Sequence, residues 1–319
     1  MIPNRFKALS SLNSKSIAFN NMASFLKRLA NKLFREATSA QSAGKLIQSI
    51  AYQKGFSPKE SIGLLYDSYS LSDEEILKIA YQRIGILNYE NDFVSGEHFL
   101  IHQVLPKYLS GVERPILFDV GANVGNYSEM LATVFPKALV FAFEPNPTTF
   151  KALQSKNLPQ ITKVNVGLGS ETKTCQIYTY ANDAQSEHAS IHKDVFGSMH
   201  GNGDVIAIDF QLDTLDNFCH NNQIGKIDFL KIDTEGNELD CLQGSKNMLA
   251  SSKINVIQFE FNEMNVISRV FLKDFYDLLP DYQLFRLHST SLTPLSTYSS
   301  MNEIFKFQNI VAIHSSLVK

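Results

Sequence analysis

Apolar residues between positions 116 and 313 recur in seven short runs with little alternation, and segments with helical periodicity lie between them. Strands that are buried on both faces carry such continuous runs, and a parallel sheet alternates them with helices. The pattern predicts an α/β domain with strands at 116–120, 138–143, 163–168, 227–232, 255–261, 282–287 and 307–313. Two further strands, at 175–180 and 205–208, are expected to flank a polar loop in an insertion at about 171–210.

The residues before the first strand predict a helical extension over 1–92, followed by the α/β domain over 93–319. Capping boxes begin at Ser57 and Ser72, and Ser95 opens a further helix. Residues 1–35 contain seven lysines and arginines and no acidic residue, and 20–35 place apolar and basic side chains on opposite helical faces. Three interpretations of this helix stay open: packing on the rest of the protein, peripheral membrane contact, and an organellar transit peptide.

The segment 116–131 joins a buried strand to a helix through a turn with two glycines, Gly121 and Gly125. Asp119 stands near the carboxyl end of that strand, at the edge where open α/β sheets bind ligands. The glycines permit backbone angles closed to other residues, so that backbone can approach a ligand. Glu144 follows Gly125 by nineteen residues, at the tip of the next strand. A carboxylate there can accept hydrogen bonds from both ribose hydroxyls of a nucleoside.

The nucleoside ligand has two candidates. A dinucleotide site normally carries G-x-G-x-x-G, whose middle glycine lets a pyrophosphate lie against the backbone. This chain has Gly-Ala-Asn-Val-Gly at 121–125, without the middle glycine. The turn therefore favours S-adenosyl-L-methionine, which carries an amino-acid tail at that place, over a nicotinamide dinucleotide.

Five segments resemble, in order, the FkbM family of S-adenosyl-L-methionine-dependent methyltransferases: FDVGANVGNYS, FAFEPNP, NVGLGS, LDTL and IDFLKIDTEGNELDCLQGS. The resemblance covers about residues 93–313. It implies a class I methyltransferase fold: a Rossmann-like, seven-stranded, mostly parallel sheet with helices on both faces, whose last strand is antiparallel and inserted between its neighbours. It also implies methyl transfer, usually to a hydroxyl of a glycan, polyketide or other specialised metabolite. The cofactor-binding residues that match or follow the family motifs are Asp119, Gly121, Asn123, Gly125, Glu144, Asn146 and Gly169.

A hydroxyl acceptor needs a general base or a metal, because its proton must leave during attack. The fourth and fifth strands end in acidic residues that are candidates for this role: Asp233, Glu235 and Glu260. Glu260 and Asn262 are expected to point to the same side of their strand and to meet Asp233 in one cleft. These oxygens could hold a divalent cation such as magnesium. We favour the metal-free case, because Asn262 is neutral and two carboxylates give a modest charge; Lys231 is expected to neutralise its acidic neighbours.

Histidines of the insertion are the other base candidates, since an imidazole near its ordinary pKa can accept a hydroxyl proton. They are His188, His192 and His200. His192 is favoured, because Ser190 and Asp194 could orient it.

Composition excludes several classes of protein. A net charge of −3 without lysine or arginine runs in the catalytic region argues against nucleic-acid binding. Three cysteines without C-x-x-C spacing suggest neither a disulfide framework nor a zinc site. With no apolar stretch of about 18 residues and no secretory signal, the expected location is cytoplasmic. Two other functions stay open: a dinucleotide-dependent oxidoreductase, and a catalytically silent methyltransferase-like binding subunit.

Overall fold

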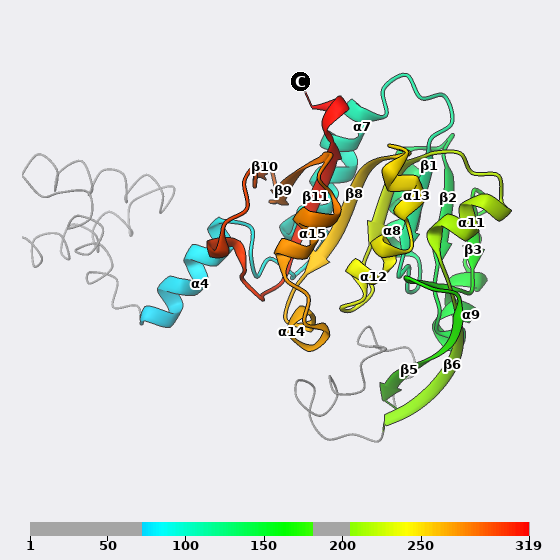
Figure 1. Cartoon of the computed structure of the whole chain (residues 1–319), viewed down its shortest axis with the longest axis horizontal. Coiled ribbons are helices and arrows are strands. Elements are labelled where there is room, and N and C mark those ends of the chain that lie inside the picture. The colour runs from blue at the N-terminus through cyan, green and yellow to red at the C-terminus, as the bar shows by residue number, and fades with distance from the viewer. Residues whose placement is uncertain (1–71, 181–204, 319) are drawn as a thin grey trace, which may run out of the picture. The chain divides into compact units, whose positions relative to one another are not determined.

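The computed structural model describes residues 72–180 and 205–318 (Figure 1). Of the first compact unit, Met1–Ala80, the described part contains the beginning of helix α4 (Asp73–Arg83). The Ser72 capping box is confirmed, because Glu75 accepts from the Ser72 backbone N–H over 2.7 Å and the Glu75 N–H donates to Ser72 Oγ over 3.3 Å. The Ser57 capping box, the basic helix at 20–35 and the histidines His188, His192 and His200 lie outside the described residues.

The second compact unit, Tyr81–Lys319, is built on one large sheet. Among the described residues this sheet has eight strands, in the order β10-β9-β11-β8-β7-β1-β2-β3. Their bounds are β1 Ile116–Val120, β2 Leu139–Phe143, β3 Ile161–Val164, β7 Ile227–Ile232, β8 Ile254–Phe261, β9 Tyr282–Leu287, β10 Leu292–Pro294 and β11 Gln308–His314. Strands β3, β2, β1, β7 and β8 are parallel, and β11 lies antiparallel between β8 and β9. The mostly parallel sheet and the inserted antiparallel strand are confirmed.

The sheet departs from the seven predicted strands in two places. Strand β10 was missed, because three residues with one leucine and a proline give no apolar run. The strand predicted at 163–168 is wrong as a single element, since β3 ends at Val164 and Gly167–Leu168 form β4 of a second sheet. The Asn165 side chain donates to the carbonyl oxygens of Glu144 and Pro145. These bonds turn the chain out of the large sheet.

The second sheet contains the predicted insertion strands, in the order β4-β6-β5. Strand β5 (Lys173–Tyr180) pairs antiparallel with β6 (Val205–Asp213), and β4 pairs parallel with β6 at Leu212 and Asp213. The two strands are longer than predicted. β6 thereby returns the chain from the insertion to the main domain.

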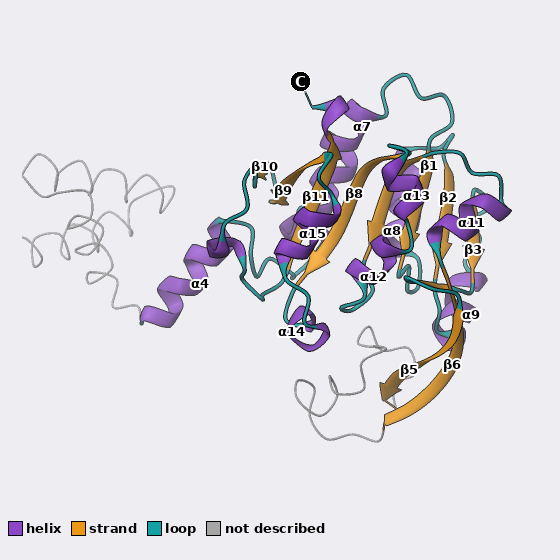
Figure 2. Ribbon diagram, in the orientation of Figure 1, coloured by secondary structure: helices purple, strands orange, loops and turns teal. Residues whose placement is uncertain are grey.

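Helices cover both faces of the large sheet, as Figure 2 shows. On one face, side chains such as Phe118 and Leu230 pack with α11 (Leu215–Asn221), α12 (Glu238–Gln243), α13 (Lys246–Ala250) and α15 (Leu272–Leu278). On the other, their chain neighbours Leu117 and Phe229 pack with α7 (Leu105–Tyr108), α8 (Asn126–Val134) and α9 (Pro147–Ser155). Successive side chains of a strand point to opposite faces, which explains the continuous apolar runs.

The remaining described helices are short. They are α5 (Asp92–Ser95), α6 (Glu97–Phe99), a π-helical turn at Leu100–Val104, α14 (Met264–Ser268) and two 3₁₀ turns at Ser300–Asn302 and Ser315–Leu317. Within the described ranges, no helix combines the length and apolar character needed to cross a bilayer.

Candidate active site

A cavity of about 960 Å³ opens at the carboxyl edge of the large sheet. Its walls come from the ends of β1, β2, β7 and β8, from β4 and β6 of the second sheet, and from the segment 89–102 that precedes β1. Open α/β sheets bind ligands at this edge. The volume suits a cofactor-sized ligand. The ligand-binding edge predicted from the strand ends is therefore hollowed in the structure.

The glycine turn after β1 packs against the protein itself. Gly121 has φ +81°, and a Cβ at this position would lie 1.7 Å from the backbone oxygen of Asp233. Gly125 precedes α8, and a Cβ there would lie 2.5 Å from Leu153 Cδ1 of α9. The structure thus gives a reason for both glycines that differs from the expected approach of backbone to a ligand. Gly121 still lines the cavity, because the turn passes over the end of β7.

Asp119 is fully buried and is not among the residues that line the cavity. Ser128 Oγ donates to its Oδ2 over 2.5 Å, and Lys231 Nζ lies 3.7 Å from its Oδ1. Burial raises the pKa of Asp119, although Lys231 and Ser128 oppose this shift. Asp119 therefore acts on the cavity through Lys231.

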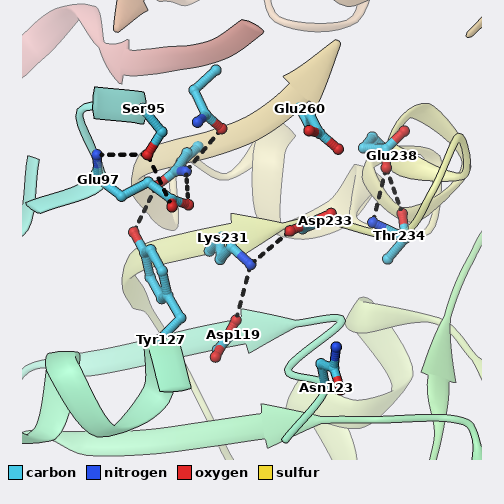
Figure 3. A network of polar contacts seen from close by, with 12 residues as sticks. Ser95, Glu97, Asp119, Asn123, Tyr127, Lys231, Asp233, Thr234, Glu238 and Glu260 are labelled. Carbon is cyan, nitrogen blue, oxygen red and sulfur yellow. Dashed lines mark hydrogen bonds and ion pairs between the residues drawn. The ribbon is translucent and has the colours of Figure 1, made fainter. Parts of the chain in front are cut away.

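Lys231 lies between two carboxylates, as Figure 3 shows. Its Nζ is 3.0 Å from Asp233 Oδ2 and 4.8 Å from the centroid of the Tyr127 ring. Burial opposes the charge of the lysine, but Asp233, Asp119 and Glu97 together raise its pKa above the usual range. The expectation that Lys231 neutralises acidic neighbours is confirmed.

Glu97 is a carboxylate of the cavity wall that the sequence did not single out. Its Oε1 accepts from Gln258 Nε2 over 3.0 Å, and its Oε2 accepts from Ser95 Oγ over 3.2 Å. Gln258 in turn accepts from the Tyr127 hydroxyl over 2.6 Å. Burial raises the pKa of Glu97, and Lys231 opposes that rise. No local pattern marks this residue, because its partner Gln258 is 161 positions away in the chain.

Glu144 directly follows β2 and lines the cavity. Its Oε2 accepts from the Asn123 backbone N–H over 3.0 Å, and its Oε1 accepts from the Asn146 N–H over 2.8 Å. Burial raises the pKa of Glu144 to about 7, against the effect of both hydrogen bonds. Asn123 has φ +49°, and its Oδ1 is buried without a hydrogen-bond partner in the described structure. Both residues line the cavity, whereas the Asn146 side chain caps α9 by accepting from the Thr148 N–H.

Gly169 lies outside the cavity lining. Its carbonyl oxygen approaches Gly244 so closely that a Cβ on Gly244 would lie 2.0 Å from it. The two residues before it, Gly167 and Leu168, line the cavity instead. Backbone of this segment therefore reaches the cavity from β4.

Asp233, Glu235 and Glu260 all line the cavity. The Asp233 side chain is 40% exposed, whereas Glu260 is 9% exposed. Burial, Asp233 and Glu235 raise the pKa of Glu260 well above its ordinary value. Glu235 has φ +54° and lies in a left-handed turn before α12, which begins at Glu238.

Side chains at the ends of the fourth and fifth strands bond to the segments that follow them. Asn262 does lie beside Glu260, to which its Nδ2 donates over 3.0 Å, but its Oδ1 accepts from the Met264 N–H. The Thr234 N–H and hydroxyl both donate to Glu238 Oε1. The chain after this turn forms two helices, α12 and α13.

The cavity wall is strongly acidic. Among the described residues, seven carboxylates line it: Asp92, Glu97, Glu129, Glu144, Asp233, Glu235 and Glu260. In the same part of the chain Lys231 is the one lysine or arginine side chain of the lining. Burial raises the pKa of Glu97, Glu144 and Glu260, so these three carry the least charge, and the remaining carboxylates make the wall attract a cation and disfavour an anion. No group of three or more histidine, cysteine or acidic side chains with metal-binding geometry is present among the described residues.

A model of the methyltransferase FkbM domain matches residues 119–283 of this chain. The chain belongs to the FkbM methyltransferase family. It is therefore an S-adenosyl-L-methionine-dependent methyltransferase of class I fold, as the sequence motifs predicted. The alternative of a dinucleotide-dependent oxidoreductase is set aside.

Two curated relatives of this FkbM methyltransferase are similar over much of their length. It is 29% identical over 204 residues to the hexuronic acid methyltransferase AglP of Haloferax volcanii, covering 63% of this chain and 73% of that protein. It is 22% identical over 183 residues to the 2-O-methyltransferase NoeI of Sinorhizobium fredii, covering 53% and 73%. A third, methyltransferase sdnD of Sordaria araneosa, is 26% identical over 156 residues, covering 41% and 60%.

Proposed function

We propose that this FkbM methyltransferase transfers a methyl group to a hydroxyl oxygen of a glycan or specialised metabolite. The observation that carries the proposal is the group of carboxylates around Lys231 in the cavity. A hydroxyl must lose its proton as its oxygen attacks, so the site needs a proton acceptor beside it. The names of two relatives, a hexuronic acid methyltransferase and a 2-O-methyltransferase, support this class of acceptor.

The residues around Glu144 fit the methyl donor. S-adenosyl-L-methionine supplies a methyl group on a cationic sulfur, which is already activated for displacement. Glu144 accepts from the ribose hydroxyls with the lone pairs that the Asn123 and Asn146 N–H groups leave over. The unpaired Oδ1 of Asn123 accepts from a further donor of the cofactor, and the acidic wall favours the positive charge.

Asp233 takes the hydroxyl proton in this proposal. It is more exposed than Glu260, and Lys231 holds it in place at 3.0 Å. Burial raises the pKa of Glu260, so Glu260 retains its own proton more readily than Asp233. It therefore donates a hydrogen bond to the acceptor and does not take the hydroxyl proton. Glu235 stands on the turn beside Asp233 and adds negative charge. His192 stays a second candidate for the base.

The partners of these oxygens support a metal-free mechanism. The Lys231 ammonium lies 3.0 Å from Asp233, where it repels a divalent cation. The Oδ1 of Asn262, which the hypothetical metal site would require, accepts from the Met264 N–H instead. The base, not a Lewis acid, therefore prepares the hydroxyl.

Labelled S-adenosyl-L-methionine, incubated with the full chain and with glycan and metabolite fractions, tests the proposal. The label is expected in a methyl ether of the product. Asp233→Asn should lower turnover by roughly 10²-fold to 10⁴-fold and retain cofactor binding. Asp277→Asn, on an exposed position of α15 outside the cavity, is the matched control.

Three outcomes would contradict the proposal. Label on nitrogen or carbon excludes O-methylation. Full activity of Asp233→Asn removes Asp233 as the base. Activity that stops in chelator and returns with magnesium excludes the metal-free mechanism.

A further inference from the structure

One part of the cavity wall is a stack of three aromatic rings. Phe93 lies on His98 with ring centroids 4.1 Å apart, and His98 lies on His102 with centroids 3.8 Å apart. The planes are inclined by 21° and 15°. Tyr89 and Phe307 line the same part of the cavity and meet edge to face. The His98 ring is covered on both faces by Phe93 and His102. Phe93 is covered by His98 on one face and is 60% exposed, so its other ring face is free.

The helix that carries the two histidines is widened at this point. The Leu105 N–H donates to the Leu100 oxygen five residues earlier, which defines the π-helical turn. Pro106 has no N–H to donate to the His102 oxygen, and its ring would press on that carbonyl in a regular helix. His102 Nδ1 lies 2.9 Å from the His98 carbonyl oxygen, and this contact ties the His102 ring to the turn that carries His98. Widened turns of this kind frequently occur at functional sites.

The segment is also tied to the edge of the sheet. Gly96 has φ +90°, and a Cβ there would lie 2.3 Å from the His288 oxygen in the turn between β9 and β10. The next residue, Glu97, is fixed by Gln258 of β8. The aromatic stack is therefore held in a defined position next to a carboxylate of the site.

The charge of the wall selects among ligands for this surface. Carboxylates accept hydrogen bonds from hydroxyl donors but repel an anion. The described lining offers no guanidinium to pair with a ligand carboxylate or phosphate. A sugar ring without charge combines hydroxyl donors with a face of C–H groups, and such a face packs on the negative face of an aromatic ring.

We infer that the segment 89–102 forms the acceptor subsite and that it binds an uncharged sugar ring, whose C–H face packs on Phe93. The inference rests on the proposed O-methylation and adds the acceptor's binding surface and charge. The proposed uncharged sugar differs from the hexuronic acid named for one relative, because a uronate carboxylate would face the acidic wall. Glu97, next to the stack, accepts from a sugar hydroxyl and orients the ring.

Saturation-transfer NMR on the full chain, loaded with S-adenosylhomocysteine, tests this inference. The probes are methyl hexopyranosides of glucose, galactose and mannose and the corresponding methyl hexuronosides. Ring C–H protons of at least one neutral glycoside should show transfer, and the uronosides should bind at least tenfold more weakly. Phe93→Ala should weaken neutral binding about tenfold. Phe271→Ala, which removes a ring that is 51% exposed outside the cavity, should leave it unchanged.

A second variant tests the charge without removing the ring. Asp92→Lys places a cation in the cavity wall and should shift the preference severalfold toward the uronosides. Three results would overturn the inference. They are tighter binding of uronosides than of neutral glycosides, an equal loss of binding in Phe93→Ala and Phe271→Ala, and no glycoside binding to a protein that still binds S-adenosylhomocysteine. Label transfer to a hydroxyl of a compound that is not a sugar would overturn it as well and leave the proposed O-methylation standing. Transfer to nitrogen or carbon would instead refute the proposed function.

Discussion

Replacing Lys231 by methionine removes the one ammonium of the described cavity lining and keeps a side chain of similar size. Asp119 then loses its ion pair while it stays fully buried, with Ser128 Oγ as its remaining hydrogen-bond donor. Asp233 is affected less, because its side chain is 40% exposed. The cost of the substitution therefore lies with Asp119.

The expected loss can be worked out in two ways. Breaking a buried ion pair by removing one partner costs about 3–5 kcal/mol. Alternatively, Asp119 takes up a proton; from its ordinary pKa of 3.8 to pH 7 this costs at most about 4 kcal/mol, at roughly 1.36 kcal/mol for each unit, because burial already raises the pKa of Asp119 in the wild type. The two figures agree. For a unit of this size the loss corresponds to a decrease in melting temperature of roughly 8–16 °C.

The stability of the Lys231→Met variant depends on pH with a definite sign. In the variant the folded-state pKa of Asp119 lies above its unfolded value, so stability is retained below pH 4 and lost as pH rises through the folded pKa. In the wild type Lys231 opposes the rise in the pKa of Asp119, so the loss relative to the wild type should be larger at pH 7 than at pH 5. Denaturant unfolding of both proteins at the two pH values measures it.

Lys226→Met is the matched control. Lys226 Nζ lies 2.9 Å from Asp228 Oδ1, but the lysine is 47% exposed and Asp228 retains the Ile116 N–H and Asn255 as donors. We expect a loss of at most about 1 kcal/mol at either pH. A Lys231→Met protein as stable as this control, or one whose loss does not change with pH, would refute the assignment of Asp119 as a buried charge that depends on Lys231.

Two further predictions concern the cofactor end of the cavity. Glu144→Ala should lose about 2–4 kcal/mol of S-adenosyl-L-methionine affinity in calorimetry, and it should cost about 1–3 kcal/mol of stability because the Asn123 and Asn146 N–H groups lose this acceptor. Because the pKa of Glu144 is about 7, wild-type affinity should fall as pH decreases from 8 to 6. Affinity that does not change over this range argues against an ionised Glu144 as the ribose acceptor. Gly121→Ala should destabilise the fold by roughly 3 kcal/mol or more, since its Cβ would lie 1.7 Å from the Asp233 oxygen. Gly225→Ala, whose Cβ would have no neighbour within 4 Å, should unfold like the wild type.

The sequence by itself determined the strands of the sheet and the edge where the site lies. Runs such as 116–120 and 227–232 are apolar at most positions because both faces of each strand are buried. The strand ends then place Glu144, Asp233 and Glu260 at one edge, and all three line the cavity. The antiparallel insertion of β11 followed from the family motifs and not from the pattern, since an apolar run does not reveal strand direction.

Only the tertiary structure decided which of these residues reach the cavity and why. Asp119 and Gly121 stand in one motif, yet Asp119 is buried beneath Lys231 and Gly121 makes room for the Asp233 backbone. Glu97 enters the site through Gln258, far away in the chain. Local patterns record burial and periodicity, which depend on a residue's near neighbours in sequence. Partners across strands depend on how the chain is connected in space, and the packing of the complete sheet fixes them.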